Sequence, residues 1–417
     1  MLRFRKILCV FCAVALCTAL CLPSFSMTAY ADEMWVGEAA EETEASADAG
    51  GGLIEAPSGV LMEASTGQII YEKEKDEKRS PASITKIMTL ILIFDALESG
   101  KLTMEDEVVT SAHAKSMGGS QVFLEEGEKQ KVETMIKCIV IASGNDASVA
   151  MAEHIGGSEE EFVKSMNERA AGLGMKDTHF VDCCGLTEST DHYTTAHDVA
   201  LMSRELITKY PKILEYSSIW MDTIIHETRQ GSKEFGLTNT NKLIRSFDGC
   251  IGLKTGSTSI AKYCVSAVAR RDDITLISVV MGAPDYKVRF KDAAAMLNLG
   301  FGKCSLYVDE NQEKLPMVAV KKGKKDQVSC AFEGSFRYLD VTGNPVEGVE
   351  KKIKMKKDIK APVKKGGTAG TAIYYLNGEE IGQVKICYQE SVEEAGFKDY
   401  LRKVWERLSL SGEPKEA

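Results

Sequence analysis

The sequence predicts an α+β protein, in which one mixed domain precedes a small all-β domain and a C-terminal amphipathic helix. Three observations predict this. Strand-like runs lie at both ends of residues 53–303, with helical patterns between them. Short β-rich runs separated by Gly and Lys turns fill residues 304–390. Residues 391–412 carry one apolar stripe at helical spacing.

The N-terminus predicts export. A positive segment, Arg3 to Lys6, precedes the apolar run Ile7–Leu22, and Ala29-Tyr30-Ala31 places small residues where signal peptidase reads them. We therefore expect residues 1–31 to be a secretory signal peptide and the mature chain to begin at Asp32. The alternative is an uncleaved anchor, but the apolar run is short for a membrane span of about 20 residues.

Composition narrows the class of protein further. Residues 32–52 are rich in Glu, Ala, Ser and Gly and predict a disordered acidic leader. The net charge of −10 argues against a nucleic-acid partner, because binding phosphates needs a basic surface. Apart from the pair Cys183-Cys184, the cysteines after residue 31 are scattered singly, without a CxxC, which favours buried free thiols.

Within residues 53–303 the apolar pattern alternates between strand and helix. The run after Ser58 predicts a hairpin that turns at Ser65-Thr66-Gly67. Ser83–Leu97 is apolar nearly all round and predicts a buried helix. The other expected elements are helical Val132–Ile155 with a break at Ser143–Asn145, helices Ser158–Leu173 and Ala196–Ile207, strands Tyr263–Ala269 and Ile274–Met281, and helix Asp292–Phe301.

Ser83-Ile84-Thr85-Lys86 is the first candidate for chemistry. A spacing of three places Ser83 and Lys86 on one helical face. A serine hydroxyl needs a neighbouring base to become a nucleophile, and a lysine is a base only when burial or positive charge lowers its pKa. The start of a buried helix supplies that burial. The plain alternative is that Ser83 is a helix N-cap, which the preceding Pro81-Ala82 also fits.

Two further motifs follow in order. Ser143-Gly144-Asn145 interrupts a helical run and offers a hydroxyl and an amide to a cleft. Lys254-Thr255-Gly256 precedes a strand, where a lysine and a hydroxyl can hold a carboxylate and a glycine lets a substrate backbone approach. The ordered set S-x-x-K, S-x-N and K-T-G is far more specific than any one member.

This set resembles that of the low-molecular-mass penicillin-binding proteins, the serine-type D-alanyl-D-alanine carboxypeptidases. The resemblance covers the chain from about residue 55 almost to its C-terminus and implies a penicillin-binding/β-lactamase-like transpeptidase domain. It also implies removal of the terminal D-Ala from peptidoglycan stem pentapeptides, and covalent inhibition by β-lactam antibiotics. The matching stretches are Pro81–Thr89, Gly118–Leu124, Ala142–Ala150, Met175–Phe180, Thr195–Ala200, Asn239–Leu243 and Asp248–Gly256.

The resemblance also implies roles for single residues. Ser83 would be acylated, Lys86 would be its base, and Ser143 would relay a proton to the leaving amine. Asn145 would hold the substrate amide. The remaining substrate-binding candidates are Lys254, Thr255 and Gly256 of the third motif, Ser257, whose amide would share the oxyanion hole with that of Ser83, and Arg289, which would help recognise the terminal carboxylate. For Arg289 the plain alternative is a solvated charge at a helix start.

Two departures from the family pattern are visible. Ser257 stands where relatives often carry His, Tyr or Phe, so we expect altered substrate or drug contacts rather than loss of activity. Asp182-Cys183-Cys184-Gly185-Leu186 stands where relatives often read Asn-Pro-His-Gly-Leu, which leaves the contacts of this loop open.

Two other functions fit parts of the pattern. A class A-like β-lactamase would need a deacylating glutamate in an E-x-x-L-N loop, and residues 146–253 contain no E-x-x-x-N. A catalytically silent peptidoglycan-binding envelope protein would not need Ser83, Lys86, Ser143 and Lys254 all intact. A zinc peptidase is disfavoured because the chain lacks H-E-x-x-H, and we expect no metal or other cofactor.

The last helical stretch, Glu393–Leu410, carries its apolar residues on one face. Its stripe consists of Phe397, Leu401, Val404, Trp405 and Leu408, and its other faces carry Lys398, Arg402, Lys403, Glu406 and Arg407. Such a helix favours the membrane interface, and a helix docked on its own domain is the alternative. We expect a peripheral protein at the outer face of the cytoplasmic membrane.

Overall fold

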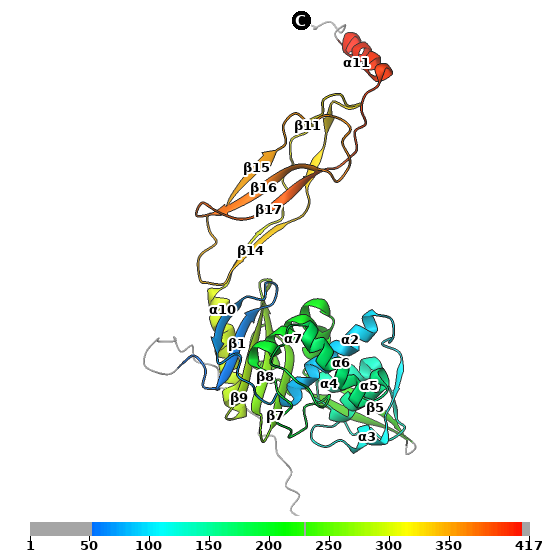
Figure 1. Cartoon of the computed structure of the whole chain (residues 1–417), viewed down its shortest axis with the longest axis vertical. Coiled ribbons are helices and arrows are strands. Elements are labelled where there is room, and N and C mark those ends of the chain that lie inside the picture. The colour runs from blue at the N-terminus through cyan, green and yellow to red at the C-terminus, as the bar shows by residue number, and fades with distance from the viewer. Residues whose placement is uncertain (1–51, 229–230, 411–417) are drawn as a thin grey trace, which may run out of the picture. The chain divides into compact units, whose positions relative to one another are not determined.

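The computed structural model describes residues 52–228 and 231–410, and of Arg407, Ser409 and Leu410 only the backbone. The expected signal peptide and nearly all of the leader therefore lie outside the described residues. The fold class is α+β, as predicted, with a mixed domain followed by a β-rich one (Figure 1).

A five-stranded antiparallel sheet is the centre of the first domain, in the order β2-β1-β9-β8-β7. The expected hairpin is confirmed, since β1 pairs with β2. All six residues of β1 are buried because both faces of the sheet are covered. The strands are β1 (Ser58–Glu63), β2 (Ile69–Lys73), β7 (Cys250–Thr258), β8 (Lys262–Arg271) and β9 (Ile274–Ala283).

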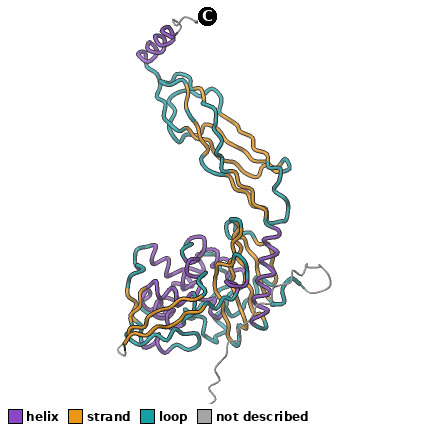
Figure 2. The backbone as a smooth tube through the Cα atoms, turned by 180° about the vertical axis from the view of Figure 1, so that it is seen from behind, coloured by secondary structure: helices purple, strands orange, loops and turns teal. Residues whose placement is uncertain are grey.

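Side chains alternate between two cores across this sheet. Leu61 packs with Leu276 and with Met296 of α10 (Tyr286–Lys303) on one face. Val60 and Met62 pack on the other face against the larger helical core. Figure 2 shows the sheet between α10 and this helical body. α10 begins earlier than the expected start at Asp292, because Asp285 caps it by accepting from the amides of Lys287 and Val288.

The helical body follows the predicted pattern with shifted ends. The expected helix at Ser83 is in fact a 3₁₀ turn, η2, that leads into α2. The break at Ser143–Asn145 is confirmed, and it separates α4 from α5. The elements are η2 (Ala82–Thr85), α2 (Lys86–Glu98), α3 (Ala112–Ser116), α4 (Val132–Val140), α5 (Asn145–Gly156), α6 (Glu159–Gly172), α7 (Ala196–Lys209), α8 (Ile213–Ser217) and α9 (Leu243–Ser246).

Two short antiparallel pairs that the sequence did not indicate complete this domain. β3 (Glu107–Val109) pairs with β4 (Lys129–Lys131), and β5 (Met221–Thr228) pairs with β6 (Gly231–Thr238). Both pairs expose many polar residues, which weakens the apolar alternation that marks a strand in a sequence.

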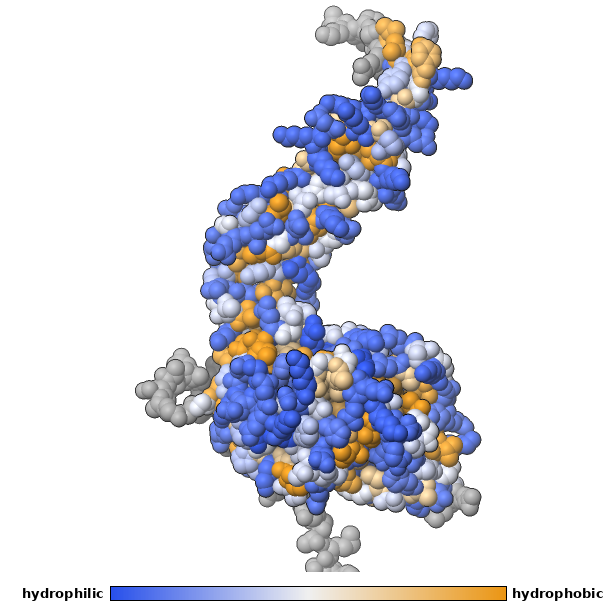
Figure 3. Space-filling view, viewed as in Figure 1, coloured by the Kyte–Doolittle hydropathy of each residue, from blue (hydrophilic) through white to orange (hydrophobic). Residues whose placement is uncertain are grey.

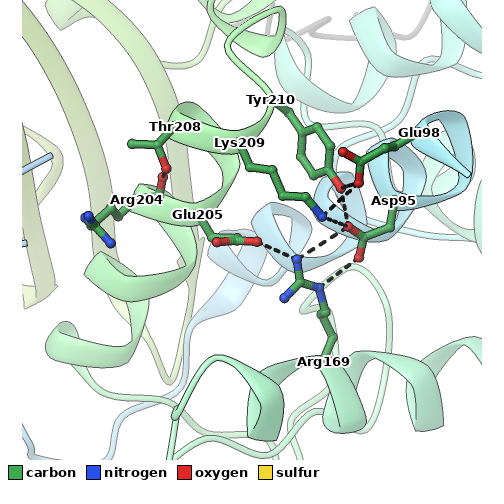
Figure 4. Close-up of polar contacts among 8 residues, drawn as sticks. All are labelled: Asp95, Glu98, Arg169, Arg204, Glu205, Thr208, Lys209 and Tyr210. Carbon is green, nitrogen blue, oxygen red and sulfur yellow. Dashed lines mark hydrogen bonds and ion pairs between the residues drawn. The ribbon is translucent and has the colours of Figure 1, made fainter. Parts of the chain in front are cut away.

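A polar cluster ties three helices together near the end of α2 (Figure 4). Arg169 of α6 donates to Asp95 of α2 at 2.8 Å and to Glu205 of α7 at 2.5 Å. The hydroxyl of Tyr210, which ends α7, donates to Asp95 and, at 3.0 Å, to Glu98. Burial alone would raise the pKa of Asp95, but the hydrogen bonds from Arg169 and Tyr210 lower it.

The second domain is built from antiparallel strands, most of them short. Its largest sheet has four strands in the order β13-β17-β16-β15, and two strand pairs, β10-β14 and β11-β12, accompany it. The strands are β10 (Ser305–Asp309), β11 (Val318–Ala319), β12 (Gln327–Val328), β13 (Cys330–Phe332), β14 (Phe336–Asp340), β15 (Glu350–Met355), β16 (Thr368–Leu376) and β17 (Glu379–Tyr388).

The final helix, α11 (Phe397–Leu410), begins four residues later than the sequence pattern suggested. The reason is that Val392 and Ala395, which precede it, are buried in the β-rich domain and bond to Val363 and Lys322. Among the described residues, no helix is long and apolar enough to cross a membrane.

Candidate active site

The turn at Ser83 places a serine beside a buried lysine. Ser83 lies in η2 after Ala82, whose φ of +47° is unusual for a residue with a side chain. Pro81, not Ser83, is the N-cap residue, and no side chain caps the turn, so the N-cap interpretation of Ser83 is wrong. Lys86 opens α2, and its Nζ lies 2.9 Å from the hydroxyl oxygen of Ser83.

Lys86 is fully buried, with three oxygen atoms around its amine. Besides Ser83, its Nζ contacts the Asn145 side-chain oxygen at 2.5 Å and the Cys184 carbonyl at 2.8 Å. Burial lowers the pKa of Lys86. A neutral amine has two protons and one lone pair. If the two protons go to the acceptor-only oxygens of Asn145 and Cys184, the lone pair faces Ser83.

The second motif lies at the break between α4 and α5. Ser143 has a φ of +62°, a strained conformation for a serine and one that often marks a functional site. Asn145 opens α5, where its amide nitrogen donates to Gly118 O at 2.7 Å. Its backbone N–H donates to Ser120 O at 2.8 Å. Asn145 therefore has a fixed orientation, with its oxygen toward Lys86.

Lys254 of the third motif contacts the second motif. It is 1% exposed on β7, and its Nζ donates to the hydroxyl of Ser143 at 2.8 Å and to Thr255 O at 2.9 Å. Burial lowers the pKa of Lys254, and the positive charges of Lys86 and Arg289 lower it further. An anion bound here would offset that electrostatic cost, so the pocket is suited to a carboxylate.

Gly256 lets the edge strand β7 lie directly against the Ser83 turn. A Cβ at this position would lie 2.8 Å from Pro81 O, 2.9 Å from the amide nitrogen of Ser83 and 3.0 Å from that of Ile84. All three neighbours are backbone atoms, which cannot move aside as a flexible side chain can. Glycine is therefore required for this approach, and it places exposed Ser257 next to the same turn.

Arg289 is 8% exposed, so its interpretation as a solvated charge is wrong. Its guanidinium donates from Nη1 to Gly256 O and Cys264 O, both at 3.3 Å, and stacks near Phe290. Burial lowers the pKa of Arg289 to about 10. Its Nε is buried with no hydrogen-bond partner among the described residues. A guanidinium that still has an N–H group free to donate, next to the third motif, is suited to binding an anion.

Thr240 is a site residue that the motifs did not single out. Its hydroxyl oxygen accepts a hydrogen bond of 2.7 Å from the hydroxyl of Thr255. Thr240 follows β6, and its amide donates to Ile141 O just before the second motif. The sequence held only an indirect signal, since Thr240 lies within the family-like stretch Asn239–Leu243.

His192 is a second residue that was missed, and it supports the serine turn from behind. Its Nδ1 accepts from the amide of Val181 at 3.1 Å, so the ring proton is on Nε2. Nε2 lies 2.8 Å from the hydroxyl of Thr85, which donates to Ala82 O at 2.8 Å. Burial lowers the pKa of His192, which favours the neutral ring that this chain of bonds requires.

The loop with the adjacent cysteines contacts this site through its backbone. The carbonyl of Cys183 accepts from Thr89 at 2.5 Å, and that of Cys184 accepts from Lys86. Both thiols are free and fully buried. The other described cysteines are also free and, apart from half-buried Cys330, buried, so the expectation of buried free thiols is confirmed for all of them except Cys330. Gly185 has a φ of +79°, and a Cβ there would lie 1.8 Å from Ala82 O.

The fold and this cluster define a class of protein. A serine hydrolase of the penicillin-binding type has these features on an α+β fold: a serine beside a buried lysine, a second serine–lysine contact and an edge strand beside the nucleophile.

Comparison with known proteins identifies the family. The family described as D-alanyl-D-alanine carboxypeptidase matches residues 41–285, and the penicillin-binding protein 5 C-terminal domain matches residues 305–394. The chain belongs to the D-alanyl-D-alanine carboxypeptidase family. It is a D-alanyl-D-alanine carboxypeptidase of the penicillin-binding kind. The predicted family, fold and enzyme class are thereby confirmed.

Several relatives cover most of the chain. It is 43% identical over 84% of its length to the D-alanyl-D-alanine carboxypeptidase DacF of Bacillus subtilis, of which 89% is covered. It is 32% identical over 86% of its length to DacC of Escherichia coli, of which 88% is covered. The solved structure of penicillin binding protein 5 from Haemophilus influenzae aligns with a TM-score of 0.64 at 29% identity, over 83% of this chain and 100% of that one.

Proposed function

We propose that the chain removes the terminal D-Ala of peptidoglycan stem pentapeptides through an acyl-enzyme on Ser83. The observation that carries this proposal is the 2.9 Å contact between the Ser83 hydroxyl and the buried amine of Lys86. Lys86 takes the serine proton, and the hydroxyl oxygen attacks the carbonyl carbon of the penultimate residue.

The other site residues have roles that follow from their places. The backbone amides of Ser83 and Ser257 hold the developing oxyanion beside the Gly256 approach. Ser143, bonded to Lys254, passes its proton to the leaving amine as the carbon–nitrogen bond breaks, and the proton that Lys86 took from Ser83 restores the Ser143 hydroxyl and leaves Lys86 neutral. Asn145 holds the substrate amide. Water then attacks the acyl-enzyme, and Ser83 regains its proton.

The terminal carboxylate binds between Lys254, Thr255 and Arg289. Lys254 and Arg289 supply positive charge from buried positions, and both pKa values are lowered by that burial. A bound carboxylate relieves the repulsion between the two cations. β-Lactams, which carry a carboxylate beside a strained amide, occupy the same place and acylate Ser83.

The two alternative functions predict other outcomes with penicillin. A β-lactamase would release the penicilloyl group quickly, and a catalytically silent binding protein would not be acylated at all.

We further propose that the chain is exported and held peripherally at the outer face of the cytoplasmic membrane by α11. The apolar stripe of this helix is exposed: Phe397 is 79%, Leu401 55% and Val404 55% exposed. Lys403, on another face of the helix, instead donates to Gly323 O at 2.7 Å. Each stripe residue that enters the membrane interface would contribute about 1.5–3 kcal/mol if fully removed from water.

Truncation tests this anchor. A chain that ends at Gly396 keeps the buried residues Val392 and Ala395 and loses α11 and the residues after it. It should release D-alanine at the rate of the full chain but no longer sediment with vesicles of neutral lipid, to which only the apolar stripe of α11 would bind. Equal sedimentation of both chains would exclude α11 as the anchor, and unfolding of the shorter chain would support the docked helix instead.

A further inference from the structure

We propose that six lysines at one end of the β-rich domain, which form no ion pair with any described residue, make a second membrane-binding element that recognises anionic lipid headgroups around the start of α11. This inference rests on the proposed membrane association and adds a surface to it. We call these residues the basic collar, and its members are Lys322, Lys356, Lys357, Lys360, Lys364 and Lys365.

Three segments far apart in the sequence build this end of the domain. Lys321 and Lys360 form an isolated parallel bridge, Val363 bridges to Val392, and Gly323 bridges to Glu394. The backbone bonds between them measure 2.7 to 2.9 Å. The collar lysines lie in or next to the first two segments, and α11 begins directly after the third. The collar and the helix therefore share one end of the domain.

The pattern of burial turns the collar lysines outward. Ile359, Ala361 and Val363 are buried, whereas the alternate residues Lys360 and Lys364 are exposed. The other four collar lysines are exposed as well. Figure 3 shows hydrophilic side chains over this end of the β-rich domain and hydrophobic ones on α11.

The collar differs from its neighbours in having no acidic partners in the part of the chain that the structure describes. Lys321, Lys324 and Lys325 form ion pairs with Asp358, Glu393 and Glu390, which cancel charge locally. None of the ion pairs among the described residues involves a collar lysine. An uncompensated cluster of six positive charges is therefore present on a chain whose net charge is −10. Such a cluster attracts a negatively charged partner.

An anionic lipid surface is the partner that fits best, because the exposed apolar stripe of α11 emerges beside the collar. Clusters of four to eight basic residues next to a membrane-bound helix recognise acidic headgroups, each charge strengthening binding by about fivefold at low salt. The effect falls off within a Debye length of about 10 Å at 0.1 M salt. The apolar stripe would then supply binding to any bilayer, and the collar would supply preference for an anionic one.

Vesicle sedimentation with matched variants tests the collar. The chain from residue 32 is compared with the triple variant Lys356→Gln, Lys357→Gln and Lys360→Gln on vesicles of phosphatidylcholine alone and with about one third phosphatidylglycerol. The control triple carries Lys101→Gln, Lys176→Gln and Lys212→Gln, which removes the same charge from exposed positions of the first domain that form no described ion pair.

The collar variant should bind anionic vesicles at least tenfold more weakly at about 0.1 M salt and bind neutral vesicles as before, while the control triple should match the unaltered chain. Equal losses in both triples would mean that net charge, not this surface, matters, and no loss in the collar variant would also overturn the proposal. Binding to soluble polyglycerol phosphate that depends on the collar, without collar-dependent vesicle binding, would assign the surface to an anionic polymer instead. If the chain that ends at Gly396 binds neutral vesicles as strongly as the full chain, the anchor proposal fails, whereas the comparison of the two triples still tests the collar, because both triples keep α11.

Discussion

Replacing Gly256 with alanine tests whether the close approach of β7 to the Ser83 turn sets the rate of acylation. The new methyl group would lie 2.8 Å from Pro81 O and 2.9 Å from the amide nitrogen of Ser83. Since both neighbours are backbone, either the strand or the turn must move. The same amide is a proposed oxyanion donor, so the movement disturbs the catalytic geometry directly.

The size of the effect follows from these distances. Ordinary contact begins near 3.4 Å, so the strand and the turn must separate by about 0.5 Å. A misplacement of 1 Å can cost about 100-fold in rate, so we expect a loss of about tenfold in the acylation rate constant. Overpacking should also destabilise the fold by about 1–3 kcal/mol.

The assay is the second-order rate of labelling by a fluorescent penicillin. Gly236→Ala is the matched control, because Gly236 also lies on a strand and a Cβ there would meet no atom within 4 Å. The control should label and unfold like the unaltered chain. Labelling of Gly256→Ala at the unaltered rate, in a folded protein, would refute the claim that this approach positions the oxyanion site.

Substitutions at three further positions test other parts of the account. Lys254→Ala should lose about tenfold to a hundredfold in kcat/KM on peptides with a free C-terminal carboxylate and much less on amidated analogues, and equal losses would contradict its role. His192→Leu should slow labelling of Ser83 about tenfold, whereas His192→Gln, which can still donate to Thr85, should restore most of the rate; equal rates in both variants would contradict positioning by this bond. Asp95→Asn should lower the thermal midpoint at pH 7. Because the folded pKa of Asp95 is depressed, its stabilisation is present above the usual carboxyl pKa of 3.8 and is lost as pH falls through the folded value, so the two melting curves should converge in acid. A gap that persists there would refute this assignment.

The motif residues could be found from the sequence because their chemistry is encoded in short spacings. Ser83 and Lys86 are three residues apart, and this spacing alone brings their side chains together in a helical turn. The contact between Ser143 and Lys254 joins residues 111 positions apart, so no spacing reveals it. It was expected only because the chain resembles a known family.

Residues that only position the catalytic side chains could not be found from short spacings in the sequence. His192 reaches Thr85 across 107 positions, and a single histidine in a polar stretch looks like any other. The exact form of the Ser83 turn was also missed, because the 3₁₀ geometry depends on the left-handed conformation of Ala82, which contacts with the Gly185 loop support. Such tertiary contacts override the local helical pattern that Ile84 and its neighbours predict.

The sequence predicted that the second domain is rich in β-strands, but it did not predict which strands pair with each other. Most of the strands in this domain are short. The sequence pattern marked β16 and β17, but it did not show that β10 pairs with β14. The isolated bridges that assemble the end near α11, such as Val363 with Val392, also arise only from tertiary structure. The run of lysines was visible in the sequence, but its position beside the last helix was not.

The central claim, that Ser83 is the nucleophile of a D-alanyl-D-alanine carboxypeptidase, is tested most directly by intact-mass measurement combined with D-alanine release. The chain from residue 32 should gain the mass of one penicillin, on the peptide that contains Ser83, and should release one D-alanine from each pentapeptide that it cleaves. Ser83→Ala, with an unchanged melting curve, should do neither. A penicillin adduct on another residue, or D-alanine release that persists in Ser83→Ala, would contradict the account.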